Sequence, residues 1–179
     1  SFAKSIINDY LNGLYKNDDM EFDNIWYLLG FNDGVYDLKE DLFRNYKPED
    51  YITVTTGLDF ETVTSTENNE ERRTVKNVSD EDYEFIVNYH KLIHPDEESR
   101  KCWESIVATS LEGRTLEKFI IFNGKGRNGK GVEDELLIAT LGDYAITLNS
   151  AALCSPLITS GPNPDIANLN KKRLVISTE

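Results

Sequence analysis

The sequence predicts an α/β fold in which a smaller mixed α and β module precedes a truncated α/β domain, and three observations support it. The apolar run 119–122 has the composition of a short strand. A glycine-rich stretch, 124–131, follows it at once. The next residues, 132–141, place apolar side chains at helical spacing. A strand, a glycine loop that contains a lysine, and a helix form, in this order, the context of a phosphate-binding P-loop.

The predicted phosphate site consists of the residues of this loop. They are Gly124, Lys125, Gly126, Arg127, Asn128, Gly129, Lys130 and Gly131. Glycines allow the positive φ angles of a tight bend, so successive backbone N–H groups can surround an anion. The helix that follows adds the positive end of its dipole. Lys130 brings a full charge to the outer phosphates and is the first predicted catalytic residue.

One position departs from the P-loop pattern. Gly124-x-x-x-x-Gly129-Lys130 is complete, but Gly131 stands where a serine or threonine is expected. That hydroxyl normally holds Mg²⁺. Either a water or another residue replaces it here, or metal-dependent turnover is weakened.

Two other interpretations of the loop remain open. The same glycines fit the dinucleotide pattern Gly124-x-Gly126-x-x-Gly129, but the acidic residue expected about 20 positions later is missing around 148–150. A glycine-rich turn that binds nothing is the second alternative. The lysine directly after the last glycine favours the P-loop.

A second motif is predicted at 174–179, an apolar strand that ends in Glu179. Hydrolysis needs an acidic residue at the end of a neighbouring strand, to hold Mg²⁺ through water or to polarise the attacking water. Glu179 is therefore the second predicted catalytic residue and the predicted metal residue. We expect strands at 118–123 and 173–178 to lie side by side or nearly so, with Glu179 close to Lys130. The alternative is a core strand that happens to end in an acid.

Residues 1–79 are predicted to form the amino-terminal mixed α+β module. Residues 2–15 have the spacing of a helix, and 25–56 have the turns and alternation of a small antiparallel sheet with its last strand at 51–56. The polar residues 61–79 form either a loop or a protruding hairpin.

Residues 80–115 are predicted to be a helical connector. Ser79 or Asp80 caps a first helix, and Pro95 ends it and starts a second one. Residues 116–179 then form the P-loop domain, truncated after its second motif.

Composition excludes several classes of site. A net charge of −13 argues against a grip on nucleic-acid phosphates by this chain alone. No apolar run approaches the ~20 residues of a membrane span. Cys102 and Cys154 have no metal-ligand spacing and indicate reduced thiols and an intracellular site. His90 and His94 are four apart, but no cysteine supports them, so ordinary histidines are expected rather than zinc ligands.

Several segments together resemble the primase-helicases of poxviruses and giant DNA viruses. They are 28–38, 47–53, 122–131, 141–144, 164–169 and 172–179. The resemblance implies a superfamily 3 helicase with an AAA-type ATPase domain, usually a hexameric ring that unwinds DNA in viral replication. It implies ATP and Mg²⁺ as cofactors, phosphate binding by 124–130, and Glu179 as the acid of the second motif.

The resemblance also implies what this chain does not hold. The polar sensor, the arginine finger and the DNA-contacting loop of such helicases would lie beyond Glu179. This chain is therefore expected to lack unwinding activity even where a parent protein has it, and DNA and the homo-oligomeric ring are partners of the parent. The expected location is the host cytoplasm or the site of viral replication.

Three functions compete on these grounds. The leading one is a fragment of a viral ATP-dependent DNA helicase. Gly131 favours the second, a nucleotide-binding or ring-assembly module without turnover. A P-loop kinase of small substrates is disfavoured, because more than 120 residues precede the loop.

Overall fold

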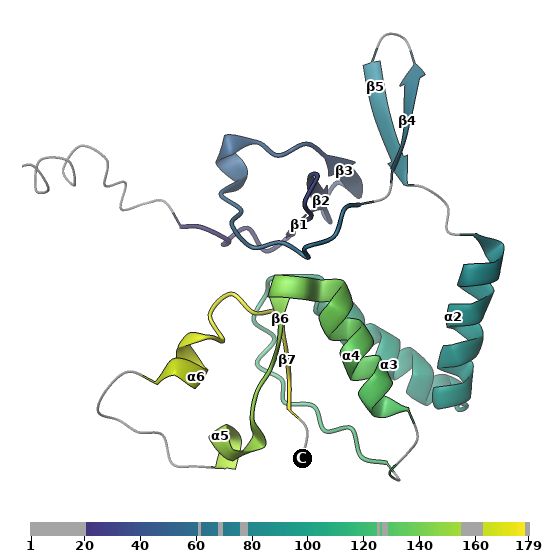
Figure 1. Ribbon diagram of the computed structural model, residues 1–179, viewed down its shortest axis with the longest axis vertical. Coiled ribbons are helices and arrows are strands. Elements are labelled where there is room, and N and C mark those ends of the chain that lie inside the picture. Colours follow the sequence, from purple (N-terminus) through teal and green to yellow (C-terminus); the bar gives the residue numbers. More distant parts are fainter. Residues whose placement is uncertain are drawn as a thin grey trace, which may run out of the picture.

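The structure is a computed structural model that describes residues 21–60, 62–67, 70–75, 79–124, 126, 129–154 and 163–177 (Figure 1). The helix that the sequence predicts at 2–15 lies outside these residues. The described strands form three small sheets: antiparallel β1-β2-β3, antiparallel β4-β5, and parallel β6-β7. Their bounds are β1 Leu28–Gly30, β2 Val35–Asp37, β3 Leu42–Arg44, β4 Thr62–Glu67, β5 Glu70–Val75, α2 Asp80–Ile93, α3 Glu97–Thr109, α4 Lys130–Leu141, β6 Ala145–Thr147, α5 Ser150–Cys154, α6 Pro164–Ala167 and β7 Leu174–Ile176, with short 3-10 turns η1 Pro48–Asp50 and η2 Gly142–Tyr144.

The predicted amino-terminal sheet is confirmed from 28 to 44. Leu29 pairs with Tyr36, and Tyr36 pairs with Phe43, across tight turns. The predicted strand at 51–56 is wrong. Tyr51 has a left-handed φ of 48°, and the carboxylate of Asp23 accepts the backbone N–H groups of Thr53 and Val54 at 2.7 and 3.1 Å. A side chain therefore takes the place of a neighbouring strand as the hydrogen-bond partner.

The polar stretch after residue 60 forms a hairpin, β4-β5, rather than a loop (Figure 1). The helix predicted after Ser79 is confirmed as α2, and the Ser79 hydroxyl accepts the N–H of Asp82 at 3.1 Å. The start of the next helix differs from the prediction. Asp96 is the N-cap of α3 and accepts the N–H of Ser99 at 2.8 Å, so Pro95 precedes the cap. A carboxylate that accepts a first-turn amide defines the helix start more strongly than proline does.

The hydrophobic core joins the amino-terminal sheet to the residues after α4. It consists of Leu29, Leu141, Tyr144 and Ala145, with Phe31, Tyr36, Val54, Ile138 and Leu174 packed around it. The Tyr144 hydroxyl accepts the N–H of Gly30 at 2.9 Å and donates to the carbonyl of Val54 at 2.7 Å. Gly142 lies so close to Thr56 that an added Cβ would be 2.0 Å from the Thr56 carbonyl oxygen.

Arg173, just before β7, links both sides of this core. Its guanidinium lies 4.2 Å from the centre of the Tyr144 ring and donates to the carbonyls of Leu28 and Leu111. Burial lowers the pKa of Arg173. The division into regions 1–79, 80–115 and 116–179 stays a prediction, and the first and last of them share one core.

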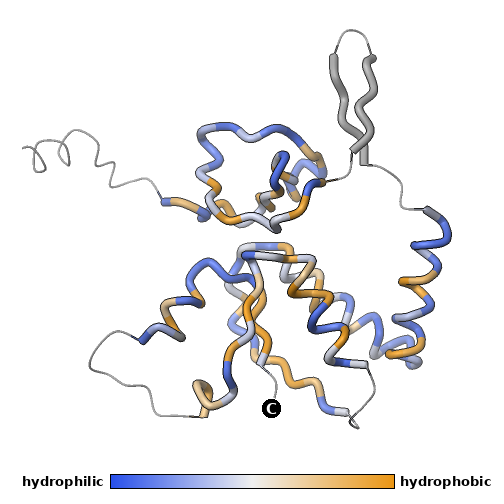
Figure 2. Tube along the Cα trace, in the orientation of Figure 1, coloured by the Kyte–Doolittle hydropathy of each residue, from blue (hydrophilic) through white to orange (hydrophobic). Residues whose placement is uncertain are grey.

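The predicted strand at 118–123 is wrong. Residues 113–124 are irregular, and Phe119 and Ile121 are 76% and 77% exposed (the orange stretch that leads to α4 in Figure 2). The strand expected near 174 exists as β7, but it pairs in parallel with β6 and not with 118–123. A strand forms only beside a hydrogen-bonding neighbour, and no described residue supplies one to this run.

Candidate functional site

The glycine loop ends in a left-handed residue that begins α4. Gly129 is the N-cap of α4, with φ 88° and ψ −6°, a left-handed conformation that glycine adopts without strain. A Cβ at Gly129 would lie 2.2 Å from Cδ1 of Ile93 on α2. Both the dihedral angle and the close approach of α2 therefore require glycine here. Gly124 and Gly126 are described as irregular backbone, whereas Lys125, Arg127 and Asn128 lie outside the described residues.

The first turn of α4 offers unpaired backbone donors. Among the described residues no side chain caps this helix, and the N–H groups of Lys130 and Gly131 have no acceptor there. The ladder begins with Val132 and Glu133, whose N–H groups donate to the carbonyl of Gly129 at 3.0 and 3.2 Å. A Cβ at Gly131 would meet no described atom within 4 Å. Free amides at the positive end of a helix, with open space beside them, suit an anion.

Lys130 is the first residue of α4 and forms no ion pair with a described residue. Lys130 influences the carboxylate of Asp134, one turn later. Burial and the Glu133 carboxylate raise the pKa of Asp134, while Lys130 opposes that rise. The lysine charge therefore remains available to a ligand at the start of the helix.

The structure adds a residue that sequence reasoning missed, Glu133. It is 3% exposed, and both of its carboxylate oxygens lie 3.0 Å from Nε2 of His94. Nδ1 of His90 lies 3.4 Å from Oε1 without hydrogen-bond geometry. The helical spacing held a signal for it, because Glu133, Leu137 and Leu141 share one face of α4 at intervals of four.

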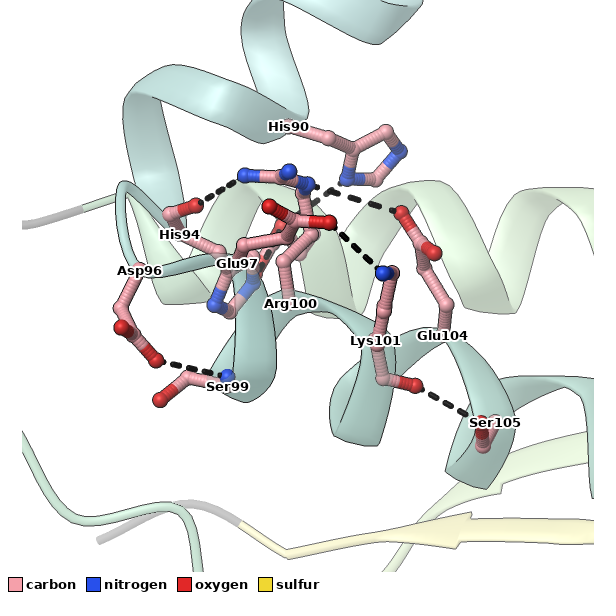
Figure 3. Close-up of polar contacts among 10 residues, drawn as sticks. His90, His94, Asp96, Glu97, Ser99, Arg100, Lys101, Glu104 and Ser105 are labelled. Atoms are coloured by element: carbon pink, nitrogen blue, oxygen red, sulfur yellow. Dashed lines mark hydrogen bonds and ion pairs between the residues drawn. The ribbon is translucent and has the colours of Figure 1, made fainter.

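The two histidines lie at the end of α2, over the beginning of α3 (Figure 3). Arg100 donates to the carbonyl of His94 at 3.0 Å, and the Trp103 ring lies 4.9 and 5.0 Å from the two imidazoles. The described part of the chain holds no group of three or more His, Cys, Asp or Glu that could bind a metal ion. His90 and His94 are thus packed partners of a buried carboxylate.

The second predicted motif is described only in part. β7 is present and Ser177 follows it, exposed, but Glu179 lies outside the described residues. The expected approach of Glu179 to Lys130 therefore stays a prediction. None of the described helices is long and apolar enough to cross a membrane.

Comparisons with known proteins find relatives in several viruses. A protein of Acanthamoeba polyphaga mimivirus, named as a candidate helicase, is 32% identical over 146 residues, which are 76% of this chain and 14% of the relative. An uncoating factor of Vaccinia virus is 28% identical over 166 residues, and the primase D5 of Fowlpox virus is 28% identical over 164. Each of these two matches covers 90% of this chain and 20% of the relative, so the chain spans a small part of its relatives.

A family model described as "D5 N terminal like" matches residues 2–112, which is more than half of the chain. The chain therefore belongs to the D5 N-terminal-like family.

Proposed function

We propose that this chain is the nucleotide-binding part of an ATP-dependent DNA helicase of viral DNA replication. The observation that carries the proposal is the left-handed Gly129 leading into α4, whose first amides are free beside Lys130. The names of the relatives, which include helicase and primase, favour the same reading. The parent protein would act as a homo-oligomeric ring, a hexamer in the resemblance, at the site of viral replication.

The residues present fit the phosphates of ATP. The free N–H groups of Lys130 and Gly131 can donate to phosphate oxygens, and the Lys130 ammonium can reach the outer phosphates. Lys125, Arg127 and Asn128 complete the proposed loop. ATP supplies a phosphoryl group that water can attack, and the chain's part is to hold and orient it.

The fit to Mg²⁺ is poorer. Gly131 has no side-chain oxygen to offer a metal, and the described residues hold no group of three or more His, Cys, Asp or Glu that could bind one. We propose Glu179 as the residue that holds Mg²⁺ through water. DNA would contact other parts of the parent protein, because this chain carries a net charge of −13.

Removal of the lysine charge tests nucleotide binding. We expect Lys130→Ala to weaken ATP binding by the 179-residue chain at least tenfold, because a charge-assisted contact contributes about 1.5–3 kcal/mol. Lys118→Ala is the matched control, since Lys118 is exposed, lies outside the loop and forms no ion pair with a described residue. Isothermal titration measures both variants. Equal affinity of the wild-type chain and Lys130→Ala would contradict the proposal.

Gly131 favours a second function, a nucleotide-binding or ring-assembly module without turnover. Gly131→Ser in the full-length parent separates the two, and the open space at this position lets the new side chain enter without a clash. A sharp rise in ATP hydrolysis would show that the natural site is impaired. An unchanged rate would show that Mg²⁺ does not depend on this position.

A further inference from the structure

Helix α4 is held at its two ends by different interactions. Its two buried residues are Glu133, in the first turn, and Leu141, at the end. Leu141 belongs to the hydrophobic core. Val132, in the first turn, is 56% exposed, whereas Ile138 packs against the core, so apolar packing holds the carboxyl-terminal half of the helix and not its first turn. The end that carries the phosphate site depends on Glu133.

The partner of Glu133 is itself well fixed. His94 is the C-cap of α2, its N–H donates to the carbonyl of His90 at 2.8 Å, and its own carbonyl accepts from Arg100. The Trp103 ring packs against both imidazoles. The hydrogen bond between the buried carboxylate and His94 therefore ties α4 to the corner formed by α2 and α3.

The same turn of α2 lies against the glycine loop. The side chain of Ile93 occupies the space that a Cβ of Gly129 would need. The Tyr89 hydroxyl is buried with no partner in the described residues, and it lies 3.8 Å from that same position. The loop and the helix start therefore share one support, the last turn of α2.

We propose that Glu133, through His94, is a positioning residue for the nucleotide site: it fixes the first turn of α4 so that the amides of Lys130 and Gly131 point at the phosphates. This inference rests on the proposed function. An uncapped helix end has four unpaired N–H groups and frays readily. Glu133 lies in that same turn, so loss of its anchor lets the donors drift from a fixed geometry and weakens binding.

Nucleotide affinity tests the positioning role, with ADP as the probe in isothermal titration. We expect Glu133→Ala to weaken binding about tenfold, as the loss of one strong contact would. Glu133→Gln should recover part of this loss, because the amide oxygen can still accept a hydrogen bond from His94. Glu135→Ala is the matched control: Glu135 is an exposed acid on the same helix. Affinity of Glu133→Ala equal to that of the wild-type chain would overturn the inference.

A double-mutant cycle tests the route through His94. If Glu133 acts through His94, the pair His94→Ala and Glu133→Ala should weaken ADP binding no more than either change alone. Losses that multiply would overturn that route. Should the alanine variants fail to fold, Glu133→Gln and His94→Gln provide the same cycle.

Amide hydrogen exchange without nucleotide separates this inference from the proposed function. Glu133→Ala should speed exchange at the backbone amides of residues 132 and 133, which form the first hydrogen bonds of α4. The amides of β1 and β2 should stay protected. Unchanged exchange in the first turn would overturn the inference whatever the nucleotide result. If the wild-type chain binds no ADP but exchange in the first turn of α4 is faster in the variant, the proposed nucleotide site is refuted. The role of Glu133 in fixing the first turn is then still supported.

Discussion

The amino-terminal sheet and the region around the glycine loop differ in where their partners come from. In the sheet region the hydrogen-bond partners are close in the sequence. Asp50 accepts two hydrogen bonds from Arg44 at 2.8 Å each and one from the N–H of Lys47 at 2.7 Å. The loop region, 113–131, has no such internal bonds among its described residues, and Phe119 and Ile121 point into solvent. Gly129 is supported instead by Ile93, from another helix.

The difference teaches that a glycine need not be supported by the segment that contains it. Turns with built-in hydrogen bonds form from neighbours in the sequence, whereas Gly129 is fixed by its place between α2 and α4. The predictions below test this contrast, from the largest expected effect to the smallest.

Replacement of two glycines by alanine should change stability by very different amounts. We expect Gly142→Ala to lower the free energy of unfolding by about 3–5 kcal/mol, because the Cβ would collide with the backbone of Thr56 and Gly142 has a positive φ. Gly131→Ala should change it by less than about 1 kcal/mol, since the space is open and alanine favours a helix. Urea unfolding measures both. A large fall in the free energy of unfolding at Gly131 would mean that this position is packed against other atoms in solution.

Two apolar side chains extend the same contrast. Leu29→Ala should cost about 2–4 kcal/mol, because Leu29 is 6% exposed and lies in the core. Ile121→Ala should cost less than about 0.5 kcal/mol, because Ile121 is 77% exposed. Thermal unfolding of both variants gives the comparison. Similar losses would show that 119–122 is buried in solution.

The sequence could predict the sheet, the hairpin alternative and the helices α2 to α4, because turns, caps and helical spacing are local. It could not predict that 51–56 bonds to the Asp23 side chain, or that 119–122 has no neighbouring strand, because those partners are distant. In the candidate site the glycines and Lys130 were evident from their order. Glu133 was not, because its burial depends on His94, 39 residues away.

The Arg44–Asp50 pair should make the sheet sensitive to acid. The Arg44 hydrogen bonds, and then the Lys47 amide, lower the pKa of Asp50 in the folded protein. A lowered folded pKa stabilises the protein above the unfolded value and the gain is lost as pH falls, so stability should drop below about pH 4.

Asp50→Asn should cost about 1–2 kcal/mol at neutral pH, as expected for lost charge-assisted bonds, and should flatten this acid slope. Urea midpoints between pH 3 and pH 7 measure both effects. Asp59→Asn is the control, since Asp59 is exposed. An unchanged slope in Asp50→Asn would assign the acid loss to other carboxylates.

The smallest effect is expected at Tyr89. Tyr89→Phe removes a buried hydroxyl without a described partner, so stability should stay the same or rise by up to about 1 kcal/mol. Thermal unfolding measures the change. A loss above about 1 kcal/mol would show that the hydroxyl has a partner in the folded chain. A fall in ADP affinity at unchanged stability would place the hydroxyl at the nucleotide.

The shared core has a practical consequence for dissecting this protein. Tyr144 bonds to Gly30 and Val54, and Arg173 bonds to Leu28 and Leu111. A piece that begins at residue 116 would present Leu141, Tyr144 and Ala145 to water, and a piece that stops before it would expose Leu29. We expect each half to aggregate alone and the two to associate when mixed. The carboxyl-terminal segment would then need the amino-terminal sheet in order to fold.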